Sequence, residues 1–354
     1  MTSSLTRRLL DLLGTRLPLI QAPMAGSQGS ALALATSRAG ALGSLPCAML
    51  SAEQLRAELQ ALADAGGGLP FNVNFFCHAP PSPDDARESV WRAALAPAYA
   101  AFGVDATQIT AGAGRQPFSH ALADAIEPFR PRVVSFHFGL PSAELMARVR
   151  AWGAAVLSSA TTVEEARWLE AHGADAVIAQ GLEAGGHRGM FLNDDLTTQL
   201  GTLALVRQAV QAVRVPVIAA GGIGDAQGVA AALALGAAGV QVGTAFLRCP
   251  EATTSTIHRA ALAAPDAHHT ALTNLFTGRP ARGIVNRFMR EWGPISPAAP
   301  AFPLATAGMS PLRSAAEAQG SGDFSPLWAG QYAAAARDVP AAEVVQALAA
   351  GLPA

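Results

Sequence analysis

Short β-rich runs alternate along this chain with Ala- and Leu-rich segments of helical period. Successive strands joined by helical crossovers run parallel, because an antiparallel pair needs no more than a tight turn. We therefore predict a TIM (β/α)₈ barrel, with a doubly wound open sheet as the alternative, since periodicity does not show closure. The candidate strands cover residues 17–24, 41–45, 71–76, 133–138, 155–160, 176–180, 215–220 and 239–244.

Two stretches are longer than a barrel requires, and we expect both to be additions around the barrel mouth. Residues 77–131 hold more than one helix, and residues 265–326 are rich in Pro, Gly and Ala with little hydrophobic period. We predict a barrel over residues 1–264 with a helical insertion near 77–131, and an extension over 265–354 whose last helix packs on the barrel. The Pro-rich tract 293–303 is compatible with a disordered linker, but aromatic residues and an Ala-rich segment near it favour packing back onto the fold.

The charges of the chain are few and scattered. Lys and Arg number 24 against 26 Asp and Glu, and charged residues make up 14% of the chain, against about 25% in typical globular proteins. No basic block is present, which argues against nucleic acid or an anionic membrane surface as a partner. A small molecule is the expected partner, and the sequence carries no prediction of the oligomeric state.

The three cysteines, Cys47, Cys77 and Cys249, are odd in number and far apart. They form no CxxC pair, which argues against a disulfide framework or a thiolate zinc site and fits a reducing cytoplasm. We expect them to be buried free thiols. No HxH or HExxH spacing is present, and His268 and His269 lack further ligands nearby, so no metal site is predicted and this pair is expected at the surface.

Two segments could be mistaken for export or membrane signals. Asp11 and Arg16 interrupt the apolar run near the N-terminus, so we predict a helix leading into the fold rather than a signal peptide. Residues 226–247 carry no charged side chain and are long enough for a membrane span, but Gln227, Gln241 and several glycines divide them into a helix, a turn and a strand. The sequence therefore predicts a cytoplasmic protein without a membrane span.

Glycine and polar residues gather at the C-terminal ends of the predicted strands, where a closed parallel barrel builds its active site. Gly221 and Gly222 follow the seventh strand, and Gly243 and Thr244 end the eighth. Backbone N–H groups there are open to a phosphate, at the usual phosphate position of such barrels. Turn geometry alone would explain the glycines after the seventh strand or those at the end of the eighth. It explains the presence of both groups less well than a phosphate site does. The other candidates at strand ends are Pro23, Met24, Asn72, Asn74, His137, Gln241 and the segment 180–189.

Two histidines are candidates for chemistry in this predicted site. His137 stands in the apolar run "VVSFHFG", where an imidazole needs a hydrogen-bond partner or a functional reason. A satisfied core histidine would explain it in isolation, but its place at the end of a strand favours a pocket-facing proton acceptor. His187 lies in the loop "GLEAGGHRG", whose glycines allow close approach to a ligand, although an ordinary loop histidine is also consistent.

Two other catalytic motifs are disfavoured. The segment "GGIGDAQG" is similar to a dinucleotide fingerprint, but Gln227 stands where the third glycine is expected, and the segment lies late in the chain. Ser158 and Ser159 lie in a strand without a GxSxG nucleophile elbow, which disfavours a serine hydrolase.

Four motifs in order along the chain resemble the nitronate monooxygenases, formerly called 2-nitropropane dioxygenases, and their class I branch in particular. They are "IQAPMAG", "SFHFGLP", "AQGLEAGGHRG" and "VIAAGGIGDAQGVAAALALGAAGVQVGTAF". The resemblance covers residues 17–246, and "PLWAGQ" at 326–331 is similar to the family's C-terminal element. The chain departs from the family at Ser27, where a further glycine is often found.

The resemblance implies a TIM barrel that holds non-covalent FMN at the strand C-termini, in agreement with the phosphate position argued from the glycines. It implies that His137 is the catalytic base and that His137 and His187 lie in the substrate pocket. The implied cofactor contacts are Pro23, Met24, Asn72, Gln180, Gly185, Gly186, Gly221, Gly222, Gln241, Val242, Gly243 and Thr244.

The implied reaction is oxidation of an alkyl nitronate, with O₂ as the electron acceptor and a carbonyl compound and nitrite as products. Propionate 3-nitronate is the family-level expectation for the substrate, and detoxification is the implied role.

Three alternatives stay open, because fold and cofactor do not determine the substrate. An FMN-dependent enoyl-ACP reductase shares the "EAGGH" loop and would use NAD(P)H with His187 as its important residue, but His137 argues against it. A flavin NAD(P)H:quinone reductase is disfavoured by Ala22 and Pro23, where that branch has "QGGM". The third alternative is a non-redox barrel enzyme that binds a phosphorylated metabolite at the same glycine loops.

Overall fold

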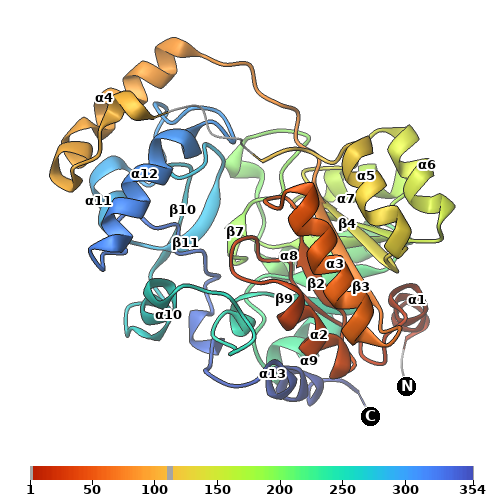
Figure 1. Cartoon of the computed structure of the whole chain (residues 1–354). Coiled ribbons are helices and arrows are strands. Elements are labelled where there is room, and N and C mark those ends of the chain that lie inside the picture. Colours follow the sequence, from red (N-terminus) through yellow and green to blue (C-terminus); the bar gives the residue numbers. More distant parts are fainter. Residues whose placement is uncertain (1–2, 110–114, 354) are drawn as a thin grey trace.

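The computed structural model describes residues 3–109 and 115–353, and its centre is a barrel of parallel strands (Figure 1). The sheet order is β1-β9-β8-β6-β5-β4-β3-β2. The two edge strands meet through an isolated parallel bridge between Ile20 and Leu42, and the Leu42 N–H donates to the Leu19 carbonyl at 2.9 Å. The sheet therefore closes, which confirms the barrel and excludes the open sheet. The barrel strands are β1 Leu19–Gln21, β2 Gly43–Pro46, β3 Phe71–Phe76, β4 Val133–His137, β5 Ala155–Ala160, β6 Ala176–Gln180, β8 Val217–Ala220 and β9 Gly239–Val242.

Each predicted barrel strand is present, and the observed strands are shorter than predicted where the chain cannot pair. The strand predicted from residue 215 begins at Val217, because Pro216 has no N–H to donate to a neighbour. The strand predicted over 17–24 ends at Gln21, before Pro23. The N-terminal helix is confirmed as α1, Ser4–Leu13, and residues 226–247 form α9, a turn and β9 as predicted.

An outer ring of helices covers the barrel. Their first turns are fixed by local side chains, as at Ser51, which forms a capping box with Gln54, and at Asp225, which accepts from the Gly228 N–H. The ring helices are α2 Ser30–Arg38, α3 Ala52–Gly66, α5 His120–Ile126, α6 Ala143–Ala151, α7 Val163–Ala171, α8 Thr202–Ala212, α9 Ala226–Ala234 and α13 Ala341–Ala349.

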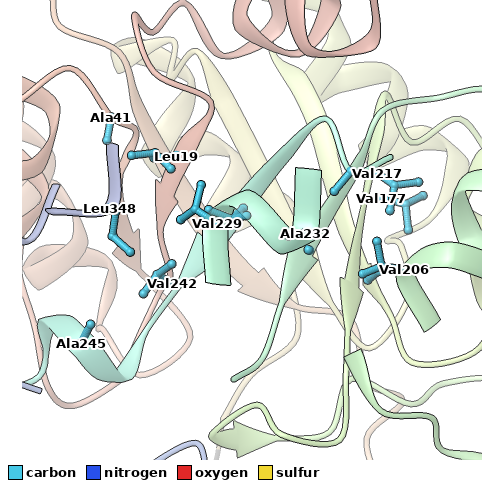
Figure 2. Close-up of a cluster of buried hydrophobic side chains, with 14 of the residues drawn as sticks. Leu19, Ala41, Val177, Val206, Val217, Val229, Ala232, Val242, Ala245 and Leu348 are labelled. Carbon is cyan, nitrogen blue, oxygen red and sulfur yellow. The ribbon is translucent and has the colours of Figure 1, made fainter. Parts of the chain in front are cut away.

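Side chains from both faces of the barrel strands are buried. The outward-facing Val177, Val217 and Val242 pack with Val229 of α9 and Leu348 of α13 in a shared cluster (Figure 2). Inside the barrel, Leu9 and Leu13 of α1 pack against the first residues of several strands and close that end. The N-terminal end of the barrel is therefore packed, and the C-terminal end is left for a site.

The insertion and the extension form a small second core at the barrel mouth. Helix α4, Asp85–Phe102, lies beside α12, Ala305–Ala318, rather than beside α5, its neighbour in sequence (Figure 1). Trp91 and Met309 pack in this core, and the Tyr99 hydroxyl donates to the Gly308 carbonyl at 2.9 Å. Helix α11 Arg287–Trp292 also contributes to this core, and an antiparallel sheet is formed by β7 Gly186–His187, β10 Thr270–Thr273 and β11 Ala281–Ile284, while α10 Thr256–Ala263 packs in a separate cluster with Leu247 and Leu327.

This arrangement refines the predicted organisation of the chain. The tract 293–303 does pack back, since Ala299 and Phe302 are buried. The predicted boundary after residue 264 stays a prediction, but α4 shares its core with the extension, and α13 belongs to the barrel ring. Residues 110–114 of the predicted insertion lie outside the described residues. Short 3₁₀ turns complete the chain at Ala106–Gln108, Glu127–Phe129, Leu196–Thr198, Thr244–Phe246 and Ala333–Ala335.

Several smaller predictions concern single residues. Cys47 and Cys249 are buried and Cys77 is half-buried, and all three thiols are free. His268 and His269 are exposed, as predicted. Across residues 3–109 and 115–353, no helix is long and apolar enough to cross a membrane, and no group of three or more His, Cys, Asp or Glu could hold a metal ion.

Candidate active site

A cavity opens at the C-terminal ends of the barrel strands and contains about 1320 Å³ of space, its open mouth included. Strand ends, the loop after β6, the loops after β8 and β9, and the segment around Trp328 line it. Most of the predicted site residues lie in its wall, namely Pro23, Met24, His137, Gln180, Gly185, Gly186, His187, Gly221, Gly222, Gln241, Gly243 and Thr244.

Two predicted cofactor residues, Asn72 and Val242, do not line the cavity. Val242 points outward into the cluster between barrel and helices, because alternate residues of a strand face opposite sides (Figure 2). Asn72 faces the barrel interior one layer below the cavity, where its Nδ2 donates to Ser44 at 3.0 Å and to Ser135 at 2.9 Å. Asn74, two residues on and on the same face of β3, lines the cavity instead.

The ring of His137 is held at both nitrogens. Nε2 lies 3.2 Å from the backbone carbonyl of His187, and Nδ1 lies 2.5 Å from the hydroxyl of Ser159 on the neighbouring strand β5. A carbonyl can only accept a hydrogen bond, so Nε2 carries the proton and Nδ1 accepts from Ser159. Gly189 allows this packing, because a Cβ there would stand 2.8 Å from Cε1 of His137. Burial, reinforced by the charge of Arg279, lowers the pKa of His137 to about 3, so the ring is neutral at neutral pH.

The turn that follows His137 is strained. Phe138 has a φ of +69°, in the left-handed region that bulky residues rarely adopt, at a cost of about 1–3 kcal/mol. Gly139 follows with a φ of +92°, and its carbonyl accepts a hydrogen bond of 2.8 Å from the Ser158 hydroxyl. The end of β4 is therefore bent away from its strand direction by contacts from β5.

The loop after β6 is tied to the strand it leaves. Gln180 donates from Nε2 to the His187 carbonyl at 2.8 Å and accepts at Oε1 from the Gly189 N–H at 2.8 Å. Arg188 is completely buried and donates to the carbonyls of Gln180 and Gly181 and to the side chain of Gln199. These bonds fix the His187 carbonyl that in turn holds the His137 ring.

The mouth of the cavity on the side of the extension is cationic. Arg115 lines the cavity, donates to Thr306 Oγ1 at 3.1 Å and lies 5.8 Å from the Phe302 ring centre. Arg279 lies nearby, over the ring of Phe138. Among the described carboxylates, none is within ion-pair distance of either guanidinium. Burial and these two arginines lower the pKa of His187 well below its usual value, so its ring is neutral.

The opposite side of the cavity is formed by glycines. Gly221 and Gly222 have φ values of +115° and +69°, and Gly186 has +73°, so all three need the freedom of glycine. A Cβ at Gly185 would stand 2.5 Å from the Gly330 nitrogen, so backbone approaches backbone here. In the cavity wall, Oε1 of Gln241 is buried and has no hydrogen-bond partner among residues 3–109 and 115–353. Such an atom is costly unless a ligand supplies a donor.

A segment from the C-terminal part of the chain closes over the glycines. The Gly330 N–H donates to Thr244 Oγ1 at 2.9 Å, and the Gln331 N–H donates to the Glu183 carbonyl at 3.0 Å. The Tyr332 hydroxyl donates to Asp225 Oδ2 at 2.9 Å, at the start of α9. The glycine-lined end of the cavity is thus covered by residues 330–332, which bond to the loop after β6, to Thr244 after β9 and to the start of α9.

The similarity to a known family extends past the four motifs to nearly the full length of the chain. The family model described as "Nitronate monooxygenase" matches residues 6–351. The chain belongs to the nitronate monooxygenase family. This family comprises oxidoreductases that are generally flavin-dependent, so the resemblance and the enzyme class expected from the sequence are confirmed.

Individual members of the nitronate monooxygenase family and related structures agree over nearly the full chain. A nitronate monooxygenase of Pseudomonas aeruginosa is 46% identical over 352 residues, which is 97% of this chain and 98% of the relative. A crystal structure of nitroalkane oxidase from Streptomyces ansochromogenes is 42% identical, with a TM-score of 0.88 and 97% of each chain covered. The structure of FabK from Thermotoga maritima is 26% identical, with a TM-score of 0.71 over 96% of this chain and 94% of FabK.

Some cavity residues of this nitronate monooxygenase family member were not singled out as site residues from the sequence. The sequence indicates Ser159 only as a disfavoured hydrolase nucleophile, and Asn74 only as a polar residue at a strand end. The β alternation that puts Asn72 and Asn74 on one face, with Asn74 nearer the strand end, was an available signal. Arg115 and Trp328 come from the insertion and the extension, and no periodicity in those stretches indicates that they reach the site.

Proposed function

We propose that this chain catalyses the FMN-dependent oxidation of alkyl nitronates by O₂ to a carbonyl compound and nitrite. The observation that carries the proposal is the neutral ring of His137, held in the cavity wall opposite a glycine-lined recess that contains the unpartnered Oε1 of Gln241. Such a site can bind a flat cofactor against backbone and place an anionic substrate next to a weakly basic imidazole.

The lining residues fit FMN. The buried oxygen of Gln241 lacks a donor, which a flavin ring or ribityl hydroxyl would provide. Gly221, Gly222 and Gly243 leave backbone accessible where the phosphate is expected, next to the start of α9. Met24, Gln180 and Gly185 would hold the rest of the cofactor, which when bound supplies the electron transfer from substrate to O₂.

The roles of His137 and Ser159 follow from their hydrogen bonds. A nitronate is already an anion and needs no base, so for it His137 would orient the substrate by sharing its Nε2–H between the His187 carbonyl and a nitronate oxygen. A neutral nitroalkane must first lose a proton, and the free lone pair of the ring is at Nδ1, which faces the Ser159 hydroxyl. In this step Ser159 would pass its hydroxyl proton to Nδ1 while its oxygen takes the proton from the nitroalkane carbon. The negative charge that develops on the nitroalkane as its proton leaves raises the pKa of the ring from its low value and stabilises the imidazolium.

Arg115 supports an acidic nitronate as substrate. Its guanidinium lines the cavity mouth and has no carboxylate partner in the described part of the chain, so a carboxylate on the substrate could bind it in a charge-assisted hydrogen bond. Propionate 3-nitronate has such a group, separated from the nitronate carbon by a short chain. We propose this compound as a substrate.

The test is an anaerobic visible spectrum of the purified protein, recorded before and after addition of ethyl nitronate, with NADH added to a parallel sample. Loss of flavin absorbance with the nitronate and not with NADH is the expected result. Loss with NADH alone would move the protein to the reductases and direct attention to His187. A colourless protein that does not take up added FMN would contradict the proposal and favour a non-redox barrel enzyme.

A further inference from the structure

The position of His137 depends on the contact between Phe138 and Arg279, neither of which takes part in the reaction. Phe138, directly after it, is buried with a left-handed backbone, and its ring centre lies 4.4 Å from that of His137. Phe76 and Phe302 pack on Phe138 with ring centres at 4.9 and 5.4 Å. A strained backbone persists only where surrounding contacts hold it. The contact that completes this enclosure comes from the extension.

Arg279 supplies that contact. Its guanidinium carbon lies 4.0 Å from the centre of the Phe138 ring, within cation–π range, and its Nη2 donates to the Met190 carbonyl. Thr277, two residues earlier, donates to the Arg279 carbonyl at 3.4 Å and lies 2.9 Å from Nε2 of His187. Arg279 therefore bridges the turn after β4, which directly follows His137, and the loop after β7, in which Gly189 packs against the His137 ring.

We propose that Arg279 is a positioning residue for His137: stacked on Phe138 and bonded to Met190, it keeps the turn after β4 in the geometry that directs the imidazole to Ser159. The proposal deepens the proposed function, because it names a residue outside the cavity lining on which the action of His137 depends. Arg279 comes from the extension, so the extension takes part in the geometry of the site as well as in covering it.

The charge of Arg279 adds an electrostatic consequence. The charged or titratable groups near His137 are Arg279 before β11, Arg188 after β7, and His187 of β7. Both arginines disfavour an imidazolium, and Arg188 is fixed by bonds to Gln180 and Gln199 that do not involve Arg279. Removal of the Arg279 charge should therefore make His137 easier to protonate, while Arg188 stays in place.

The experiment compares three variants of the full-length protein. Arg279→Met removes both the positive charge and the planar guanidinium. Arg279→Lys keeps the charge but cannot stack a planar group on the Phe138 ring. Arg282→Lys is the matched control, because Arg282 lies on the same segment and also donates to backbone, but to Leu182 and Thr270 rather than near Phe138. The readouts are the ring ¹⁵N signals of labelled His137 as a function of pH, assigned with His137→Asn, and kcat, KM and flavin content with ethyl nitronate.

In Arg279→Met we expect the His137 signals to shift, its titration to move up by about one pH unit, and kcat to fall about tenfold at near-constant KM and flavin content. Arg279→Lys should keep a titration close to that of the original protein and still lose kcat. Arg282→Lys should leave the His137 signals unchanged.

Unchanged His137 signals and titration in Arg279→Met, or an equal disturbance in Arg282→Lys, would overturn the proposal. If Arg279→Met does not fold, as judged by its melting temperature, Arg279→Lys decides through its ring signals. The ring measurements need no turnover, so failure of the proposed reaction and failure of this positioning role are distinguishable.

Discussion

Ser159 Oγ lies 2.5 Å from Nδ1 of His137, so the acceptor nitrogen of the candidate base is engaged by a hydroxyl on the neighbouring strand. Ser159→Ala removes this bond and leaves Nδ1 without a defined donor. We expect kcat with ethyl nitronate to fall about tenfold, since orientation of the ring is lost while the cofactor recess is not touched. Steady-state kinetics with flavin quantification measures this, with Ser310→Ala as control because that exposed hydroxyl donates to the carbonyl of Thr306 in its own helix. Equal activities of the two variants would remove Ser159 from the mechanism.

His137→Asn tests whether the imidazole moves a proton or only orients the substrate. Neutral nitroethane needs deprotonation, whereas ethyl nitronate does not, so the variant should lose about a hundredfold more activity on the first than on the second. The ratio of kcat/KM for the two substrates measures this directly and cancels any loss of folded protein. A loss of the same size on both substrates would contradict the role of His137 as the catalytic base.

Gln241→Leu separates cofactor binding from stability. Because Oε1 of Gln241 is buried without a partner among the residues that the structure describes, its removal should stabilise the flavin-free protein by about 1 kcal/mol. The same change should weaken FMN binding at least tenfold, since the ligand loses an acceptor. Melting temperatures of flavin-free protein and FMN fluorescence titrations give the two quantities, with the exposed Gln208→Leu as control. Undiminished FMN affinity would show that this oxygen is not a cofactor contact.

Arg115→Met tests the preference for acidic substrates. Loss of a charge-assisted hydrogen bond should raise KM for propionate 3-nitronate about tenfold, and KM for ethyl nitronate should stay within twofold. Arg92→Met is a matched control, because Arg92 lies in the same insertion and binds Ile109 and Glu88 instead of facing the cavity. If both substrates respond alike, Arg115 shapes the mouth without recognising a carboxylate.

The buried histidines predict the response of stability to acid. Burial lowers the pKa of His137 to about 3 and those of His78 and His258 to about 4. The unfolded chain therefore takes up protons below about pH 6.5 while the folded chain does not, so stability is full above pH 6.5 and falls toward pH 4.

His258→Gln tests the contribution of one of these histidines to the loss of stability in acid. Glutamine does not titrate but can still donate to the Trp328 carbonyl that Nε2 of His258 faces. Between pH 6 and pH 4.5 the free energy of unfolding should fall less steeply in the variant than in the original protein. The two slopes should differ by about 1.4 kcal/mol per pH unit, the value for one proton. Urea unfolding across this range measures both slopes. Parallel slopes would mean that His258 does not bind its proton differently in the two states.

Local patterns in the sequence predict those parts of this protein that depend on neighbours in the chain. Strand and helix periods identified every barrel strand, and the glycine groups after residues 220 and 242 identified the recess, because turn geometry is a local property. His137 was found because a polar ring in an apolar strand is unusual in its own neighbourhood. The loop of His187 was found for the same kind of reason, from its glycines.

The tertiary structure alone decided which distant residues meet. Closure through Ile20 and Leu42, the contact of Ser159 with His137, and the arrival of Arg115 and Arg279 at the mouth each join segments without a shared local pattern. The register between strands placed Asn74 rather than Asn72 in the cavity wall. Such contacts arise when apolar faces pack, and the geometry of packing depends on the whole set of side chains rather than on any one stretch.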